Sequence, residues 1–376
     1  AYCTRLLAGF GAEVIKIEVP GKGSPLRHIR PFKHDIPGAE NSGLFLYLNL
    51  NKKSLTLNLE TATGIKLFKE LAEKADAVIE DFAPGKLSRL GLGFRSLQKI
   101  NPRLGMTSIT GFGQTGPYKN YKMNHLTAWG MSGARYNDGT PGVRPVQIGG
   151  WLTHYITGLF AHVGTCTALF DRNTRGRARH VDVSMWESNL LVTCYPTTIY
   201  SYRGVLHNAV SKERMGIFKC KDGYIGLNLY GRLNFELLCN FLGMTGLTED
   251  PKFNTPAAFI KNFEEARAII SEKVKERGKM ELFQAAAEWR IPVGLVPDAA
   301  EILASPQMQA RGFFEEIEHP TIGKVIMPGA PFKMSATPWK TNGTAPLLGQ
   351  HNQEIICRRL GHSGVDLLKL RQRGII

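Results

Sequence analysis

The stretch Lys53-Ser-Leu-Thr-Leu-Asn-Leu59, followed by Thr61 and then by Ala77-Val-Ile-Glu-Asp-Phe82, decides the fold of this chain. Residues 53–59 alternate between polar and apolar side chains, which predicts a strand. Thr61 is a good helix N-cap, and residues 65–72 carry apolar side chains at helical spacing. Residues 77–82 form a second short strand. A strand, a helix and a strand in this order predict a parallel βαβ unit.

The flanking segments continue the alternation of helices and strands. Such parallel sheets bind ligands at the carboxyl ends of their strands, and the glycine-rich loop 111–116 leaves such an end. The further elements that we predict here are helices over 4–10, 87–90, 97–100 and 154–170 and strands over 13–19, 105–111 and 179–185.

The pattern changes near residue 200. Residues 217–229 predict a hairpin with Asp222-Gly223 at its turn, and three helices follow, over 233–242, 263–277 and 280–288. We read 291–297 and 327–338 as extended connections and 353–360 and 365–373 as short helices. The expected organisation is an α/β large domain begun by residues 1–200, a small middle α+β domain over 215–300, and a return of 320–376 to the large domain.

Composition narrows the class of protein. The chain has 376 residues, of which 43% are hydrophobic and 21% charged, as in ordinary globular proteins. No stretch approaches the ~20 apolar residues of a membrane span, and we expect no signal peptide and a cytoplasmic location. The six cysteines include no C-x-x-C pair, so we expect reduced thiols and neither a disulfide framework nor a metal site.

The formal net charge of +15 raises the question of an anionic partner. No run of five Lys/Arg residues and no nucleic-acid motif is present, so we expect no nucleic-acid binding. A phosphate-rich small molecule suits dispersed basic residues better. The alternative interpretation of the net charge, a basic surface that binds no ligand, is not excluded by the sequence.

Several motifs in a fixed order resemble family III CoA-transferases over essentially the whole chain. They are Leu-Ala-Gly-Phe-Gly-Ala-Glu-Val-Ile-Lys-Ile-Glu (7–18), Asn-Lys-Lys-Ser-Leu-Thr-Leu-Asn-Leu (51–59), Glu-Asp-Phe-Ala-Pro-Gly (80–85), Gly-Phe-Gly-Gln-Thr-Gly-Pro-Tyr (111–118), Arg-Gly-Phe-Phe-Glu-Glu-Ile-Glu-His-Pro (311–320) and Pro-Gly-Ala-Pro-Phe-Lys-Met-Ser-Ala-Thr-Pro (328–338). The resemblance implies a Rossmann-like large domain built from both chain ends, a small middle domain and an interlocked, ring-like dimer. It also implies an opening strand and loop before Ala1.

The resemblance implies that coenzyme A or an acyl-CoA binds as a substrate and that no cofactor is tightly bound. Arginine suits phosphates because its planar group donates two parallel hydrogen bonds. Arg27 matches a basic residue near the phosphates, although Ser24 stands where the family usually has aspartate, and Arg89 matches an arginine at the adenine end. Asp81 stands where the family more often has asparagine. The positions that match contacts along the nucleotide are Leu57, Asn58, Leu59, Asp81, Phe82 and Ala83.

His154 stands where the family carries its acyl group on an aspartate, in the run Gly-Gly-Trp-Leu-Thr-His-Tyr-Ile-Thr-Gly-Leu-Phe (149–160). In the chemistry that the resemblance implies, that carboxylate forms a mixed anhydride and then an enzyme-CoA thioester. Both need a carbonyl carbon on the protein. An imidazole has none, so His154 cannot replace the aspartate step for step.

Two interpretations follow. In the first, the chain is the non-acylating subunit of a hetero-oligomer, as in benzylsuccinate-type transferases of anaerobic aromatic degradation, and a related catalytic chain supplies the aspartate. In the second, the chain resembles the 2-methylacyl-CoA racemases of the same fold, which exchange a proton between an aspartate and a histidine. The position of that aspartate is His154 here, and the position of that histidine is Asn124 or, one residue later, His125. Proton exchange would then run between His154 and His125. A self-sufficient transferase that uses another carboxylate and a relative without turnover are further alternatives, and the partner can be a second copy of the chain in a homodimer. In every case we expect a CoA thioester and a small carboxylic acid as ligands, and no membrane partner.

Overall fold

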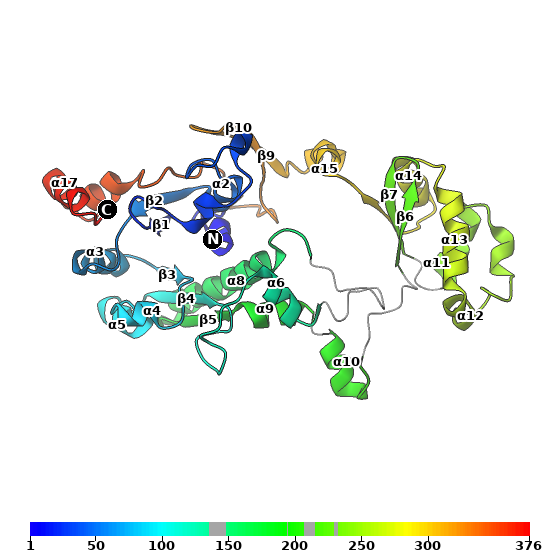
Figure 1. The fold of residues 1–376 in the computed structure, drawn as a ribbon, viewed down its shortest axis with the longest axis horizontal. Helices are drawn as coiled ribbons and strands as arrows, with labels where there is room; N and C mark the ends of the chain where they lie inside the picture. Colours follow the sequence, from blue (N-terminus) through cyan, green and yellow to red (C-terminus); the bar gives the residue numbers. More distant parts are fainter. Residues whose placement is uncertain (135–147, 194, 207–214, 229–231) are drawn as a thin grey trace. The chain divides into compact units, whose positions relative to one another are not determined.

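The computed structural model describes residues 1–134, 148–193, 195–206, 215–228 and 232–376 (Figure 1). The chain divides into two compact units. The first unit is built from Ala1–Arg135, Val146–Gly204 and Gly312–Ile376, and the second mainly from Val205–Arg311. Parallel sheets with covering helices confirm the predicted α/β class.

Two parallel sheets form the framework of the first unit. In one, β1 (Val14–Glu18) pairs with β2 (Lys52–Thr56). In the other, β3 (Ala77–Glu80), β4 (Gly105–Thr110) and β5 (His180–Ser184) lie side by side in that order, all parallel. The predicted order of strand, helix and strand around Thr61 is therefore confirmed, but β2 and β3 lie in separate sheets and do not pair with each other.

The helix between β2 and β3 shows why this part of the sequence folds locally. It is α3 (Ala62–Glu73), and the Thr61 hydroxyl accepts a hydrogen bond from the Gly64 amide at 3.0 Å, as an N-cap does. Its buried face includes Leu67 and Phe68, which join a hydrophobic core with Leu55 of β2 and Leu104 just before β4. The remaining helices and helical turns of the first unit are α1 (Tyr2–Gly9), η1 (Pro25–His28), η2 (Lys33–Asp35), α2 (Gly43–Asn49), α4 (Lys86–Arg89), α5 (Phe94–Ile100), α6 (His125–Met131), α8 (Leu152–Arg175), α9 (Met185–Val192), α10 (Tyr195–Arg203), η4 (Glu354–Arg359) and α17 (Gly364–Gln372).

The long helix α8 packs unusually closely on its neighbours. A side chain at Gly158 would lie 2.9 Å from the Tyr2 Cβ of α1, and one at Gly164 would lie 2.8 Å from a Val181 methyl group of β5. Glycine at both positions therefore lets the backbone approach α1 and the sheet. The helix is longer than the predicted 154–170, because it runs on to Gly176, where a left-handed residue ends it.

A hairpin that the sequence reading missed completes the first unit. Strands β9 (Phe314–His319) and β10 (Gly323–Pro328) pair antiparallel. The predicted extended connection over 327–338 therefore begins inside β10.

The second unit is a three-stranded antiparallel sheet with helices. The predicted hairpin is confirmed as β6 (Met215–Cys220) and β7 (Gly223–Asn228). The interpretation of 291–297 as a connection is wrong, because Val293–Val296 forms β8 and pairs with β7. The helices of this unit are α11 (Arg232–Phe241), η3 (Thr245–Thr248), α12 (Pro256–Lys261), α13 (Phe263–Val274), α14 (Lys279–Glu288), α15 (Ala299–Ala304) and α16 (Pro306–Ala310).

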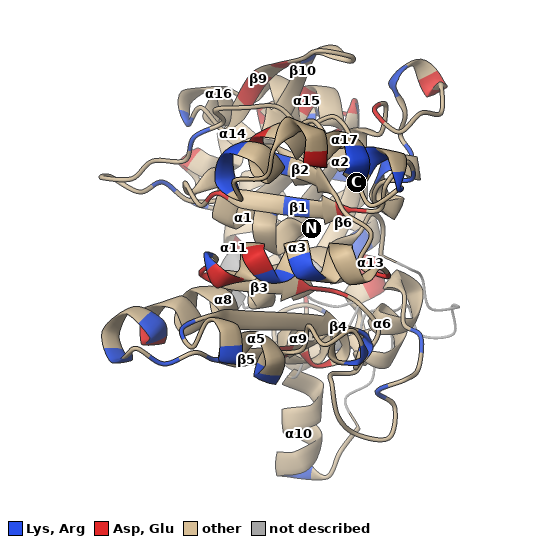
Figure 2. Cartoon of the chain, turned by 90° about the vertical axis from the view of Figure 1, so that its left-hand side faces the viewer, with Lys and Arg blue, Asp and Glu red and all other residues tan. Residues whose placement is uncertain are grey.

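Basic side chains are spread over the described part of the chain. Figure 2 shows Lys and Arg dispersed over many elements and not gathered in one block. Within the described residues no helix combines the length and the apolar character that crossing a bilayer requires.

Candidate active site

His154 lies in the first turn of α8. Trp151 is the N-cap residue, and its carbonyl accepts the backbone N–H of His154 at 2.9 Å. The turn is held from α9 by Asn189, a fully buried residue whose amide Nδ2 donates to the Thr153 carbonyl at 3.2 Å. The residue at position 154 is thus placed by two packed helices.

His125 lies beside His154 at the start of α6. It is 7% exposed, its Nδ1 lies 2.7 Å from the Thr153 hydroxyl, and its Nε2 lies 3.1 Å from the Ile148 carbonyl. Asn124 directly before it is the N-cap of α6, and its side-chain oxygen accepts the Thr127 amide at 3.0 Å. The structure therefore brings His125 and His154 together and gives Asn124 a capping contact.

The two imidazoles form a small aromatic group with Trp151. The ring centroids of His125 and His154 are 6.2 Å apart, and Trp151 packs edge-on against His154 at 5.3 Å. The Thr153 hydroxyl lies between the imidazoles, 3.4 Å from Nδ1 of His154. No pattern in the sequence indicated that Thr153 would contact both histidines.

The electrostatic surroundings favour a neutral His154. The residue as a whole is exposed, but the surrounding protein partly desolvates its ring. This desolvation, followed by the neighbouring His125, lowers the pKa of His154. A neutral imidazole can accept a hydrogen bond or a proton at a free ring nitrogen.

The lowered histidine pKa values predict a loss of stability in mild acid. Below pH ~6.5 the unfolded chain binds protons that the folded chain resists, so the free energy of unfolding decreases from pH 7.5 to pH 5.5. Urea unfolding at the two pH values measures this, and an equal or higher midpoint at pH 5.5 would contradict it. The raised pKa of Glu80 acts in the opposite direction, but it is one group, whereas the histidines with a lowered pKa are five. Burial lowers the pKa of His154, His162, His180, His319 and His351.

The nucleotide positions that the resemblance implies lie where β2 and β3 end. The Asn58 amide donates to the Ile375 carbonyl at 2.8 Å, which holds the segment Leu57–Leu59 after β2. The Phe82 amide donates to the Glu80 carboxylate at 2.8 Å, and the segment Asp81–Ala83 leads into α4.

Lys86 of α4 contacts Phe82 in one of these segments and Glu60, the residue directly after the other. Its ammonium group lies 5.0 Å from the Phe82 ring centroid and 4.0 Å from a Glu60 carboxylate oxygen. Arg89 is exposed at the end of the same helix. Lys86 was missed by the sequence reading, although it stands directly after the turn 83–85.

Arg27 lies in a different environment from the one expected. The residue is fully buried, its guanidinium donates twice to the Glu18 carboxylate at 2.9 Å, and it donates once to Glu40 at 2.6 Å. Burial alone would raise the pKa of Glu18, but hydrogen bonds from Arg27 and Ser54 outweigh it and lower that pKa. This placement is that of a structural ion pair, and phosphate binding by Arg27 stays a prediction.

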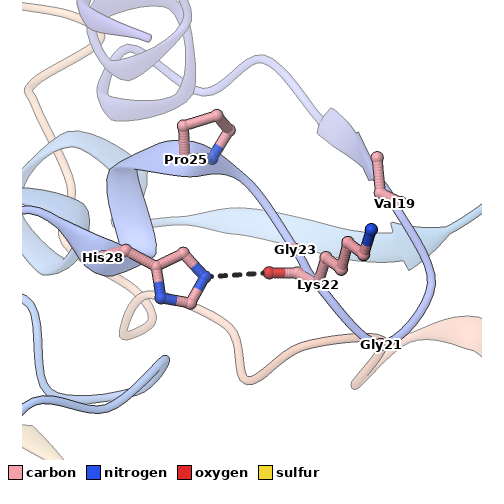
Figure 3. Close-up of a pocket in the computed structure, with 6 residues that line it drawn as sticks. All are labelled: Val19, Gly21, Lys22, Gly23, Pro25 and His28. Carbon is pink, nitrogen blue, oxygen red and sulfur yellow. Dashed lines mark hydrogen bonds between the residues drawn. The ribbon is translucent and has the colours of Figure 1, made fainter.

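The loop that leaves β1 forms an open pocket of about 500 Å³ (Figure 3). Val19, Lys22, Pro25 and His28 line it, and the His28 Nε2 lies 3.1 Å from the Lys22 carbonyl. The pocket follows the carboxyl end of a parallel strand, the usual ligand edge of such sheets.

Cysteines and candidate metal ligands can be placed only within the described residues. Cys3, Cys166, Cys220, Cys239 and Cys357 are free, and Cys194 lies outside the described residues. Over the part of the chain that the structure describes, no group of three or more His, Cys, Asp or Glu residues is placed to hold a metal ion.

Comparisons with known proteins agree on one class of enzyme. The model of "CoA-transferase family III" matches residues 1–352. Succinyl-CoA–D-citramalate CoA-transferase of Chloroflexus aurantiacus is 33% identical over 388 residues, which cover 100% of this chain and 94% of that protein. Subunit BbsE of succinyl-CoA:(R)-benzylsuccinate CoA-transferase from Thauera aromatica is 29% identical, with 100% and 94% covered. The crystal structure of a CAIB/BAIF family protein from Brucella suis superposes with a TM-score of 0.85 at 28% identity, covering 95% of this chain and 94% of that one.

The fold and these relatives define an enzyme that acts on CoA thioesters, a CoA-transferase. The chain belongs to CoA-transferase family III.

Proposed function

We propose that this chain is the non-acylating subunit of a heteromeric family III CoA-transferase that acts on acyl-CoA thioesters and carboxylic acids. The observation that carries the proposal is His154 in the first turn of α8, at the position that the family resemblance assigns to the acyl-carrying aspartate. An imidazole can be acylated, but it cannot hold CoA as a thioester, because it has no carbonyl carbon. A related chain with an aspartate at this position would carry the covalent intermediates.

The similarity to BbsE supports a heteromer. That protein is named as a subunit of a CoA-transferase for (R)-benzylsuccinate, and the match covers 100% of this chain and 94% of that protein. An interlocked dimer, a role in aromatic acid degradation and a cytoplasmic location belong to the same proposal.

We place the nucleotide of CoA at the ends of β2 and β3. The backbone of Leu57–Leu59, the segment Asp81–Ala83 and Arg89 would contact it, with Lys86 as a further cation. Lys and Arg side chains near the carboxyl ends of parallel strands are suited to phosphates.

Proton exchange at the α-carbon of a thioester is the second candidate function. The proximity of His125 and His154, with ring centroids 6.2 Å apart, favours it. However, both nitrogens of His125 already have partners and the residue is buried. Incubation of the chain with a chiral 2-methylacyl-CoA in deuterated water separates the two candidates, because exchange by the chain alone would favour the racemase-like function.

Reconstitution tests the preferred function. The purified chain alone should transfer no CoA. Mixed with the related aspartate-bearing chain that copurifies from its source, it should form a complex that transfers CoA. Substitution of that aspartate by asparagine in the related chain should abolish turnover of the complex. Transfer by the present chain without a partner would refute the heteromer.

A further inference from the structure

A threonine hydroxyl joins the two histidines of the site. Thr153 is fully buried, and its Oγ1 lies 2.7 Å from Nδ1 of His125 and 3.4 Å from Nδ1 of His154. The second distance is at the long end of the hydrogen-bond range. A hydroxyl has one proton to donate and two lone pairs, so it can donate to one ring and accept from the other.

The Ile148 carbonyl decides which ring the Thr153 hydroxyl donates to and which ring it accepts from. We call this chain of hydrogen bonds from His125 through Thr153 to His154 the relay. A carbonyl can only accept, so the hydrogen bond of 3.1 Å from His125 places the proton of that ring on Nε2. Nδ1 of neutral His125 then holds a lone pair, and the Thr153 hydroxyl donates to it. The Thr153 oxygen is left to accept, which requires a proton on Nδ1 of His154.

We propose that Thr153 is a positioning residue that holds His154 as the Nδ1–H tautomer, so that the Nε2 lone pair faces a neutral hydrogen-bond donor, the thiol of coenzyme A. Among the described residues no hydrogen bond to Nε2 of His154 is present, and the residue is exposed. The identification of the donor rests on the proposed function, whereas the tautomer rests on the hydrogen bonds alone.

The chemistry of the two groups selects a thiol over a carboxylate. A lone pair on a neutral ring repels a carboxylate oxygen and attracts an S–H or O–H group. A thiol has a pKa of ~8.5, above the lowered pKa of His154. The thiol therefore keeps its proton and donates a hydrogen bond, and His154 orients it.

Nitrogen NMR of the full chain with ¹⁵N-labelled histidine tests the tautomer at pH 8. His154, assigned by its loss in His154→Gln, should show a protonated Nδ1 and an unprotonated Nε2. Thr153→Val should remove this preference, and Thr153→Ser, which keeps the hydroxyl, should retain it. The matched control is Thr157→Val, because Thr157 is also buried on α8 but donates to the Thr153 carbonyl at 2.6 Å and not to a ring. A proton on Nε2 of His154 in the unsubstituted chain would overturn the relay, as would an unchanged tautomer in folded Thr153→Val.

Titration with CoA and with desulfo-CoA tests the donor. CoA should shift the Nε2 resonance of His154, and desulfo-CoA, which lacks only the thiol, should leave it in place. Equal shifts with both ligands, or none with CoA, would overturn the thiol as donor. Neither the tautomer measurement nor the CoA titration depends on turnover. A failure of the heteromer proposal would therefore be seen in a separate experiment, as CoA transfer by the chain alone.

Discussion

Replacing Arg27 with methionine should destabilise the first unit by about 3–5 kcal/mol, the usual cost of removing one partner of a buried ion pair. The Arg27 and Glu18 side chains are both fully buried. Without the guanidinium, the Glu18 carboxylate keeps hydrogen bonds from the Ser54 hydroxyl at 2.7 Å and the Ser24 amide at 2.9 Å, together with the electrostatic attraction of Lys16. A charge left in that environment is costly because it has lost its water as well as the ion-pair partner that donated two hydrogen bonds to it.

Urea denaturation with Arg30→Met as the control measures this effect. Arg30 pairs with Asp35 at 3.6 Å, but both side chains are 73% exposed, so its loss should cost less than about 1 kcal/mol. If Arg27 instead serves mainly as a phosphate ligand, Arg27→Met would keep its stability and lose CoA affinity. A change in stability below 1 kcal/mol would thus contradict the structural role.

The His154→Asp variant should gain a covalent adduct that the unsubstituted chain lacks. Position 154 is in the first turn of α8, where the positive end of the helix dipole favours an ionised carboxylate. An ionised carboxylate is the nucleophile that the thioester chemistry requires. After incubation with an acyl-CoA, intact-mass measurement should show a fraction of the variant with added acyl or CoA mass, against none before the substitution.

His154→Asn is the matched control for that variant. Asparagine has the size and shape of aspartate but no nucleophilic carboxylate, so it should form no adduct. An adduct on both variants would place the nucleophile elsewhere. An absence of adduct on folded His154→Asp would mean that the chain lacks more of the acylation site than one carboxylate.

The local part of the fold could be predicted from the sequence, and the long-range pairings could not. The Thr61 cap and the α3 apolar face are local signals, and α3 was predicted. The strand predicted over 53–59 ends early, at Thr56, where its pairing with β1 ends at Glu18. Beyond it the Asn58 amide bonds to Ile375, more than three hundred residues away, and no local pattern shows such a contact.

The β8 segment shows a second limit. In residues 291–297 two prolines flank the four residues Val-Gly-Leu-Val, which is typical of an extended connection. The same extended backbone pairs with β7 because the fold places it there. An extended backbone was predicted from these residues, but the strand and its pairing with β7 were not.

The candidate site was predicted by position and not by contact. The resemblance to the family indicated His154 and His125, and the two lie side by side. The hydrogen-bond partners of His125 stand 23 and 28 residues further along the chain, so the relay through Thr153 became visible only in three dimensions. For Arg27 the motif suggested a ligand for phosphate, whereas its partners are Glu18 at the end of β1 and Glu40 in a turn, which only the folded chain brings together.

Intact-mass measurement of the unsubstituted chain, incubated alone with an acyl-CoA and a carboxylic acid, tests most directly that His154 leaves this subunit without a covalent intermediate. The account predicts one mass, equal to that of the untreated chain. An acyl or CoA adduct mapped to any aspartate or glutamate of this chain would contradict it.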